Sequence, residues 1–169
     1  AVGVSGVPEI IPLPQQITLG TGQFTLCEAQ SAPVAASVRI LADAASRQNA
    51  EYLATALFRS TGRRFRIDST DGVAAAPGTI LLTTNASMQS LGGEGYELTV
   101  DTNSVVVRAP GQAGVFYGIQ TILQLLPPEI YSPRPGAGVS WTMPCLYIKD
   151  SPRFAWRGWM LDSVRHFFT

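Results

Sequence analysis

The chain of 169 residues is poor in charge. Charged residues make up 14% of it, and its 12 basic and 12 acidic side chains cancel. An average soluble domain is about one quarter charged, but the 46% of hydrophobic residues is ordinary, so the chain is not a disordered, charge-solvated one. Nucleic-acid binding needs a basic face, and these cations are scattered along the sequence. We expect a folded domain with no nucleic-acid partner.

Long hydrophobic runs are also missing. The long apolar run at residues 109–128 is interrupted by three glycines and three glutamines, whereas a membrane span needs about 18 continuous apolar residues. We therefore expect no membrane span. Residues 1–8 lack the basic and apolar regions of a signal peptide, so either none exists or it has been removed.

The residues of the common catalytic motifs are scarce. His166 is the single histidine, which excludes a multi-histidine metal site. The sequence has no Cys-x-x-Cys, no phosphate-loop lysine and no G-x-S-x-G. No two carboxylates stand out as a catalytic pair. We expect no metal and no cofactor.

Two cysteines, Cys27 and Cys145, lie 118 residues apart. A disulfide between them would close a long loop and stabilise the fold. Two free, buried thiols are the alternative, and neither their spacing nor their neighbours suggest metal or redox chemistry.

Apolar periodicity predicts two helices. In residues 47–60 apolar side chains recur at spacings of three and four, and Gly62 stands at the position of a C-cap. In residues 112–126 the same pattern ends at two consecutive prolines. Gly118 lies inside this second helix, which indicates close packing against a sheet.

Alternation and short apolar runs predict strands between and beside the helices. Residues 31–45 form an alanine-rich connector without a clear pattern. Strands flanking two helices of similar length indicate a two-layer α+β domain at residues 9–150, after an N-terminal extension of residues 1–8. We expect a mainly antiparallel sheet with both helices on one face. The predicted strands are residues 10–13, 15–26, 64–67, 79–83, 95–100, 104–108 and 143–148.

An aromatic and arginine-rich segment follows this domain. Arg157 lies between Trp156 and Trp159, and burying a guanidinium among apolar side chains is costly unless it meets acceptors. Arg157 therefore either pairs with a carboxylate or faces a polar ligand. Further along the segment come Asp162, Arg165 and His166, which could cap a following helix or pair with one another.

Three stretches resemble one known family. The sequence R-G-x-M-L-D-x-x-R-H-F at residues 157–167 resembles the first barrel strand of the family 20 glycoside hydrolases, the β-N-acetylhexosaminidases. Residues 113–126 are similar to the helix that closes the small α+β domain preceding that barrel. Residues 11–14, Ile-Pro-Leu-Pro, resemble the start of that small domain. The three stretches occur in the family's order and together extend over most of the chain.

The resemblance implies a fold and an activity for the parent protein. It assigns residues 9–150 to the non-catalytic α+β domain and residues 151–169 to the first strand of a truncated (β/α)8 catalytic barrel. The parent would be a retaining exo-β-N-acetylhexosaminidase that removes terminal N-acetylglucosamine or N-acetylgalactosamine from glycans or chitin fragments. Catalysis in this family is substrate-assisted and uses no metal. We expect an extracytoplasmic location: secreted, periplasmic or lysosomal.

The resemblance also implies roles for individual residues. Arg157 would bind hydroxyls of the terminal sugar through its planar set of donors. Asp162, Arg165 and His166 would support the strand and the loop after it. The family's general acid and orienting aspartate are adjacent on the fourth barrel strand, and this sequence contains no Asp-Glu dipeptide. We therefore expect no catalytic residue in this chain and no activity from it alone.

Three further interpretations remain open at this stage. The α+β domain could act alone as a carbohydrate-binding or interaction module. The remainder of the barrel could belong to the same chain or to an associated one. A different glycosidase family with a similar leading domain is a weaker alternative, because the motif at residues 157–167 belongs to the barrel.

Overall fold

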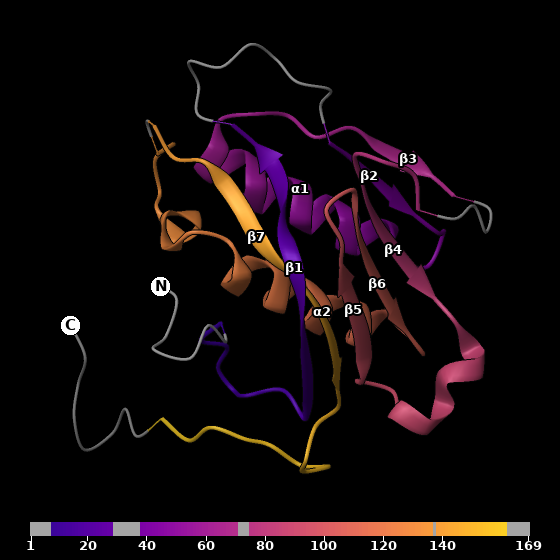
Figure 1. The fold of residues 1–169 in the computed structure, drawn as a ribbon. Helices are drawn as coiled ribbons and strands as arrows, with labels where there is room; N and C mark the ends of the chain where they lie inside the picture. Colours follow the sequence, from indigo (N-terminus) through magenta and orange to yellow (C-terminus); the bar gives the residue numbers. More distant parts are fainter. Residues whose placement is uncertain (1–7, 29–37, 71–74, 137, 162–169) are drawn as a thin grey trace.

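The computed structural model describes residues 8–28, 38–70, 75–136 and 138–161, and Figure 1 shows their arrangement. The helices are α1 (Arg47–Thr61) and α2 (Gln112–Leu125), with 3-10 turns η1 (Ala86–Leu91) and η2 (Pro128–Tyr131). The strands are β1 (Gln16–Cys27), β2 (Arg39–Ala42), β3 (Ile67–Ser69), β4 (Thr79–Thr84), β5 (Tyr96–Val100), β6 (Ser104–Ala109) and β7 (Trp141–Asp150).

Seven strands form one sheet in the order β1-β7-β5-β6-β4-β2-β3. The neighbours from β1 to β6 are antiparallel, and those from β6 to β3 are parallel. The expectation of a mainly antiparallel sheet is therefore correct for one half only. Parallel neighbours need a crossover connection, and α1 supplies the one between β2 and β3.

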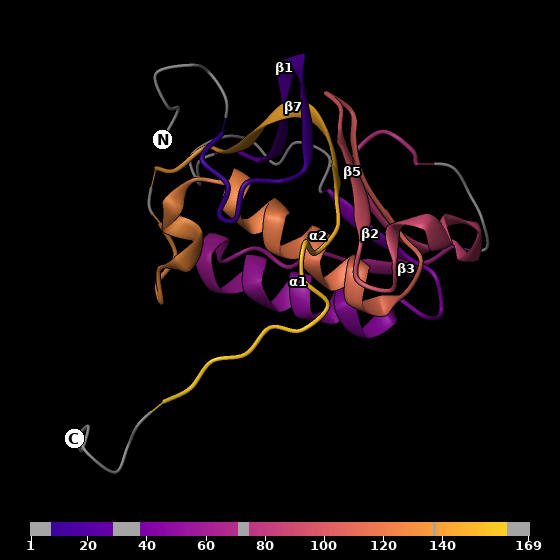
Figure 2. The same ribbon diagram turned by 90° about the horizontal axis from the view of Figure 1, so that it is seen from below.

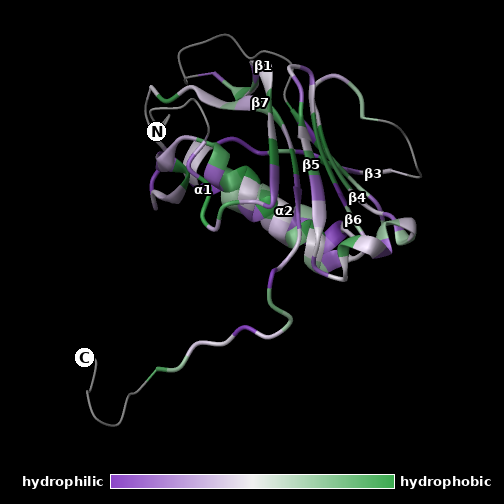
Figure 3. Ribbon diagram, turned by 60° about the horizontal axis from the view of Figure 1, so that its bottom comes forward, coloured by the Kyte–Doolittle hydropathy of each residue, from purple (hydrophilic) through white to green (hydrophobic). Residues whose placement is uncertain are grey.

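The two helices lie side by side on one face of the sheet, as predicted (Figure 2). Beneath them a row of residues in register crosses five strands, and each is at most 1% exposed. Figure 3 shows the hydrophobic colouring of β4 and β6, two of the strands that carry this row. Burial of such a continuous row supplies the main driving force for folding. Its members are Ala42, Leu82, Val107, Leu98 and Ile148.

Helix α2 approaches the sheet closely because it presents glycines to it. A Cβ atom on Gly118 would lie 2.5 Å from Cγ1 of Val107, which confirms the close packing predicted there. A Cβ on Gly114 would overlap the carbonyl oxygen of Gly95 and lie 2.7 Å from Cβ of Ala109. The Gly95 carbonyl group just before β5 and the side chains of Val107 and Ala109 on β6 therefore set the distance between the helix and the sheet.

Helix α1 has the boundaries that its sequence predicts to within one residue. Its inner face carries Leu53 and Leu57, both fully buried. Gly62 ends the helix with a φ of 69° and donates its N–H to the Phe58 carbonyl oxygen at 2.9 Å. This left-handed conformation is one that glycine adopts without steric cost.

The sequence-based assignment missed one strand and displaced another. Strand β2 lies inside the supposed connector at residues 31–45, and Ile40, Leu41 and Ala42 are buried on both faces of the sheet. A buried parallel strand of four residues shows no alternation, so its pattern cannot be told from a linker. Strand β3 begins at Ile67, where the prediction ended, and residues 10–13 form no strand.

The barrel strand predicted within residues 151–169 is not formed in its described part. Residues 151–161 are extended, and among the described residues none pairs with them in a ladder. A strand is stabilised by hydrogen bonds to its neighbours. The neighbours in a barrel would come from strands that this sequence does not include.

Asp43 connects three elements at the loop between β2 and α1. Its Oδ1 accepts the N–H of Ser46 at 2.7 Å, just before α1, and its Oδ2 accepts the N–H and the hydroxyl of Thr84 at the end of β4. Burial acts to raise the pKa of Asp43, but these hydrogen bonds outweigh it and lower the pKa below its usual value. The ionised carboxylate therefore stabilises the native state.

We predict that Gly114→Ala destabilises the fold. The new methyl group meets backbone and Cβ atoms that cannot rotate away, and such overpacking costs about 1–3 kcal/mol, more than the gain of up to about 1 kcal/mol in helix propensity. Urea unfolding measures the difference. Gly93→Ala is the control, because a Cβ there has no neighbour within 4 Å. Equal midpoints for the two variants would contradict the packing argument.

We also predict that Asp43→Asn weakens the fold in a pH-dependent way. At neutral pH the variant should lose about 1.5–3 kcal/mol, the range for hydrogen bonds to charged groups. Because the pKa of Asp43 is lowered by folding, its contribution is complete above the unfolded-state pKa of about 4 and disappears as the pH falls through the native value. The free energies of unfolding of the parent protein and of the variant should therefore become equal at low pH. Urea unfolding at several pH values measures both. Glu51→Gln, in an exposed pair with Arg47, should change little.

Candidate functional site

The candidate site lies where the chain leaves the sheet. We call residues 16–150 the sheet domain and residues 151–161 the exit segment, which extends away from the end of β7 in Figures 1 and 2. The exit segment carries the exposed aromatic side chains of Trp156 and Trp159, at 85% and 86% exposure. A groove of about 720 Å³ lies between it, helix α2 and residues 10–13.

Side chains of α2 and β7 fix the two chain segments that border the groove. Gln124 accepts the Ile11 N–H at 2.9 Å and donates to the Ile11 carbonyl oxygen at 3.1 Å. Gln15 donates its backbone N–H to Asp150 at 3.0 Å and its amide to the Ser151 hydroxyl oxygen at 3.0 Å. The beginning of the exit segment is thereby tied to the residues just before β1.

Arg157 is held at two points. Its Nη2 donates to Oε1 of Glu94 at 2.8 Å, and its Nη1 donates to the Phe154 carbonyl oxygen at 2.7 Å. Tyr117 on α2 donates its hydroxyl to the same Glu94 oxygen at 3.2 Å. The pair is open to solvent, with side-chain exposures of 41% for Arg157 and 39% for Glu94.

The electrostatics of this cluster favour its charged forms. The hydrogen bond from Arg157 is the largest influence on Glu94 and lowers the pKa of that carboxyl group. The same hydrogen bond raises the pKa of Arg157. Deeper in the groove, burial raises the pKa of Tyr96 to about 12, and its hydroxyl group shares a hydrogen bond with Thr121 at 2.6 Å. Tyr96 therefore remains neutral at physiological pH.

Two roles were left open for Arg157, pairing with a carboxylate and binding a polar ligand. The structure shows the pair with a carboxylate. Nη2 donates to Glu94 and Nη1 to the Phe154 carbonyl oxygen, and the guanidinium has five N–H donors in all. Donors remain for a second partner such as a sugar hydroxyl. Sugar binding by Arg157 therefore stays a prediction, compatible with the pair. Asp162, Arg165 and His166 lie outside the described residues.

Sequence reasoning missed Glu94 and Tyr117. Glu94 lies in a glycine-rich turn before β5, where a carboxylate is ordinary, and its partner is 63 residues away in the sequence. The one available signal is Tyr117, a large aromatic residue on the partly exposed side of α2, opposite the apolar stripe. Helical periodicity predicts that such a residue is exposed, but it does not identify the residue that it contacts.

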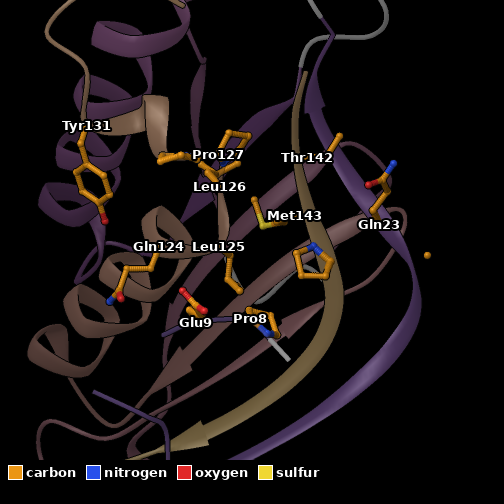
Figure 4. A pocket seen from close by; sticks show the side chains of 13 residues that line it. Pro8, Glu9, Gln23, Gln124, Leu125, Leu126, Pro127, Tyr131, Thr142 and Met143 are labelled. Carbon is orange, nitrogen blue, oxygen red and sulfur yellow. The ribbon is translucent and has the colours of Figure 1, made fainter. Parts of the chain in front are cut away.

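A second cavity, of about 660 Å³, lies between the end of α2 and strands β1 and β7 (Figure 4). Prolines, leucines and amide side chains dominate its lining, and Glu9 is its one charged member among the described residues. Without a buried ionisable group or a second charge, this cavity offers no chemistry of its own.

The two cysteines and the acidic groups of the described residues form no cluster suited to a metal ion. Cys27 and Cys145 are free thiols, and burial raises the pKa of both. Within the described ranges no three His, Cys, Asp or Glu side chains are grouped so that they could hold a metal ion. None of the described helices has the length and apolar character needed to cross a membrane.

Fold and site together define a class. A seven-stranded mixed sheet covered on one face by two helices is a two-layer α+β architecture. The family model described as Glycosyl hydrolase family 20, domain 2, matches residues 7–151. The chain therefore belongs to glycoside hydrolase family 20.

Relatives in sequence and in structure agree with this assignment. The chain is 33% identical over 160 residues to a beta-hexosaminidase of Porphyromonas gingivalis, covering 95% of this chain and 19% of the relative. A mutant Streptomyces plicatus beta-hexosaminidase in complex with the product GlcNAc matches with a TM-score of 0.77 and 32% identity, over 94% of this chain and 29% of that one.

A third comparison gives the same result. The GH20 beta-N-acetylhexosaminidase of Streptomyces coelicolor A3(2) matches with a TM-score of 0.75 and 30% identity, over 95% of this chain and 30% of that one. The chain thus spans 19–30% of the length of these three relatives.

Proposed function

We propose that this chain is part of a retaining exo-β-N-acetylhexosaminidase that hydrolyses terminal N-acetylglucosamine or N-acetylgalactosamine from glycans or chitin fragments. The observation that carries the proposal is the family match over residues 7–151. The relatives are named as beta-hexosaminidases, and one of them was solved with GlcNAc bound. The substrate of this protein is accordingly an N-acetylhexosamine-containing glycan.

The reaction needs groups that the sequence does not contain. In substrate-assisted hydrolysis the 2-acetamido oxygen of the sugar attacks the anomeric carbon while an enzyme carboxylic acid protonates the leaving oxygen. No Asp-Glu dipeptide is present to supply the acid and the orienting aspartate. The remainder of a (β/α)8 barrel, in the same or an associated chain, is therefore the proposed partner, in an extracytoplasmic compartment.

The contribution of this chain to the sugar site is Arg157. A guanidinium offers several donors in one plane, which suits adjacent hydroxyl groups on a sugar ring. Its open donors and its 41% exposure leave room for such a ligand. Asp162, Arg165 and His166 are proposed to support the strand that carries it. A stand-alone binding module is not favoured, because these relatives are named as hydrolases.

We predict that the 169-residue chain does not hydrolyse a chromogenic N-acetylglucosaminide, because the general acid is missing. The full-length protein, which would supply the barrel, should hydrolyse it. Release of the chromophore measures both rates under the same conditions. Turnover by the short chain above the background rate would contradict this account of the missing groups.

We also predict that Arg157→Ala in the full-length protein raises KM and lowers kcat/KM by about 10- to 100-fold, the loss expected for one or two charge-assisted hydrogen bonds. The melting temperature should change little, since an exposed ion pair contributes at most about 1 kcal/mol. Steady-state kinetics and thermal unfolding measure the two effects. An unchanged KM with a large drop in melting temperature would assign Arg157 to the ion pair alone.

A further inference from the structure

The arginine proposed to bind the sugar is attached to the sheet domain by a side chain from a distant part of the sequence. Glu94 lies in the turn before β5 and Arg157 on the exit segment, 63 residues apart, and the distance from Arg157 Nη2 to Glu94 Oε1 is 2.8 Å. The exit segment has no regular secondary structure of its own. Without an external contact, a long arginine side chain on such a segment samples many rotamers.

Glu94 is itself held by α2. The Tyr117 hydroxyl donates to the same Oε1 atom that accepts from Arg157, at 3.2 Å. The Tyr117 ring packs edge-on against Phe116, with centroids 5.8 Å apart, and Phe116 packs against Tyr52 of α1 at 5.4 Å. A chain of contacts therefore runs from both helices through Tyr117 to Glu94. The orientation of the carboxylate is fixed by the packed sheet domain.

The two contacts of Arg157 use neighbouring donors. Nη2 is bonded to Glu94, and Nη1 to the Phe154 carbonyl oxygen at 2.7 Å. A planar guanidinium fixed at both terminal nitrogens has a defined plane and direction, and it still has donors for further acceptors. A group held in this way loses less rotational freedom when it binds a ligand.

We propose that Glu94 and Tyr117 are positioning residues that orient the guanidinium of Arg157 for the hydroxyl groups of the sugar. The non-catalytic domain thus contributes to substrate affinity although it touches no substrate. This inference rests on the proposed function, since it gives Arg157 the sugar-binding role. It gives the sheet domain a part in the reaction beyond supporting the barrel.

Positioning and simple stabilisation predict different results. Both partners are about 40% exposed on their side chains, and exposed ion pairs contribute little to stability. If Glu94 only stabilised the fold, its loss would lower the melting temperature and leave KM unchanged. If Glu94 orients Arg157, its loss raises KM and leaves the melting temperature nearly unchanged.

The experiment compares variants of the full-length protein. We expect Glu94→Gln to lower kcat/KM about 10- to 100-fold, mainly through KM, since small misplacements of a binding group have effects of this size. Tyr117→Phe, which removes one hydroxyl group, should have a smaller effect in the same direction. In an Arg157→Lys background, Glu94→Gln should have little further effect, because the two residues act through one contact.

Two matched control variants test the specificity of these effects. Glu97→Gln removes a carboxylate of the same sheet domain that faces Lys149 at 3.6 Å. Tyr131→Phe removes the hydroxyl group of a 65% exposed tyrosine on η2, outside the groove. Both should keep the kinetics of the parent protein. Equal KM values for Glu94→Gln and Glu97→Gln, in an active protein, would overturn the inference and leave the proposed function intact.

A second readout does not depend on activity. Trypsin cleaves after arginine, and a guanidinium bonded to Glu94 is a poorer substrate than a free one. In the 169-residue chain, Glu94→Gln should speed cleavage after Arg157 severalfold, and Glu97→Gln should not. If the full-length protein were inactive, the proposed function would be wrong. The cleavage rates would still show whether Glu94 holds Arg157. Unchanged cleavage would overturn the inference.

Discussion

The close approach of α2 to the sheet is the constraint on which the rest of the molecule depends. Gly114 and Gly118 have no side chains between the helix axis and strands β5 and β6, so the helix lies directly on Ala109 and Val107. At this distance a flank of α2 presents Tyr117 and Gln124 to Glu94 and to Ile11, which border the groove. If side chains in place of Gly114 and Gly118 moved the helix away from the sheet, the contacts of Tyr117 and Gln124 would change.

The same packing links stability to the candidate site. Burial beneath the helices supplies the driving force, while the site itself consists of exposed groups that add little to it. Arg157, Glu94 and Tyr117 can therefore be changed with modest cost to the fold, and Gly114 cannot. Because the residues that stabilise the fold differ from those of the candidate site, a change in KM at the site can be measured without unfolding the protein.

Because the chain belongs to glycoside hydrolase family 20, the contact between Glu94 and Arg157 can be related to function. The chain spans 19–30% of the length of the three reported relatives and carries the part that the family model describes as domain 2. The contact between Glu94 and Arg157 joins that domain to the segment expected to begin the barrel. Under the proposed function, this contact would let a domain without catalytic residues hold a side chain that binds the substrate.

The sequence by itself determined the elements whose signals are local. Helix periodicity, the stop at Pro127 and the C-cap at Gly62 placed both helices to within one residue, and the turn after Val100 placed the β5–β6 hairpin. Only the tertiary structure decided the parallel half of the sheet, the short strand β2 and the pairing of Arg157 with Glu94. These depend on contacts between distant residues, whose partners leave no periodic trace in the chain.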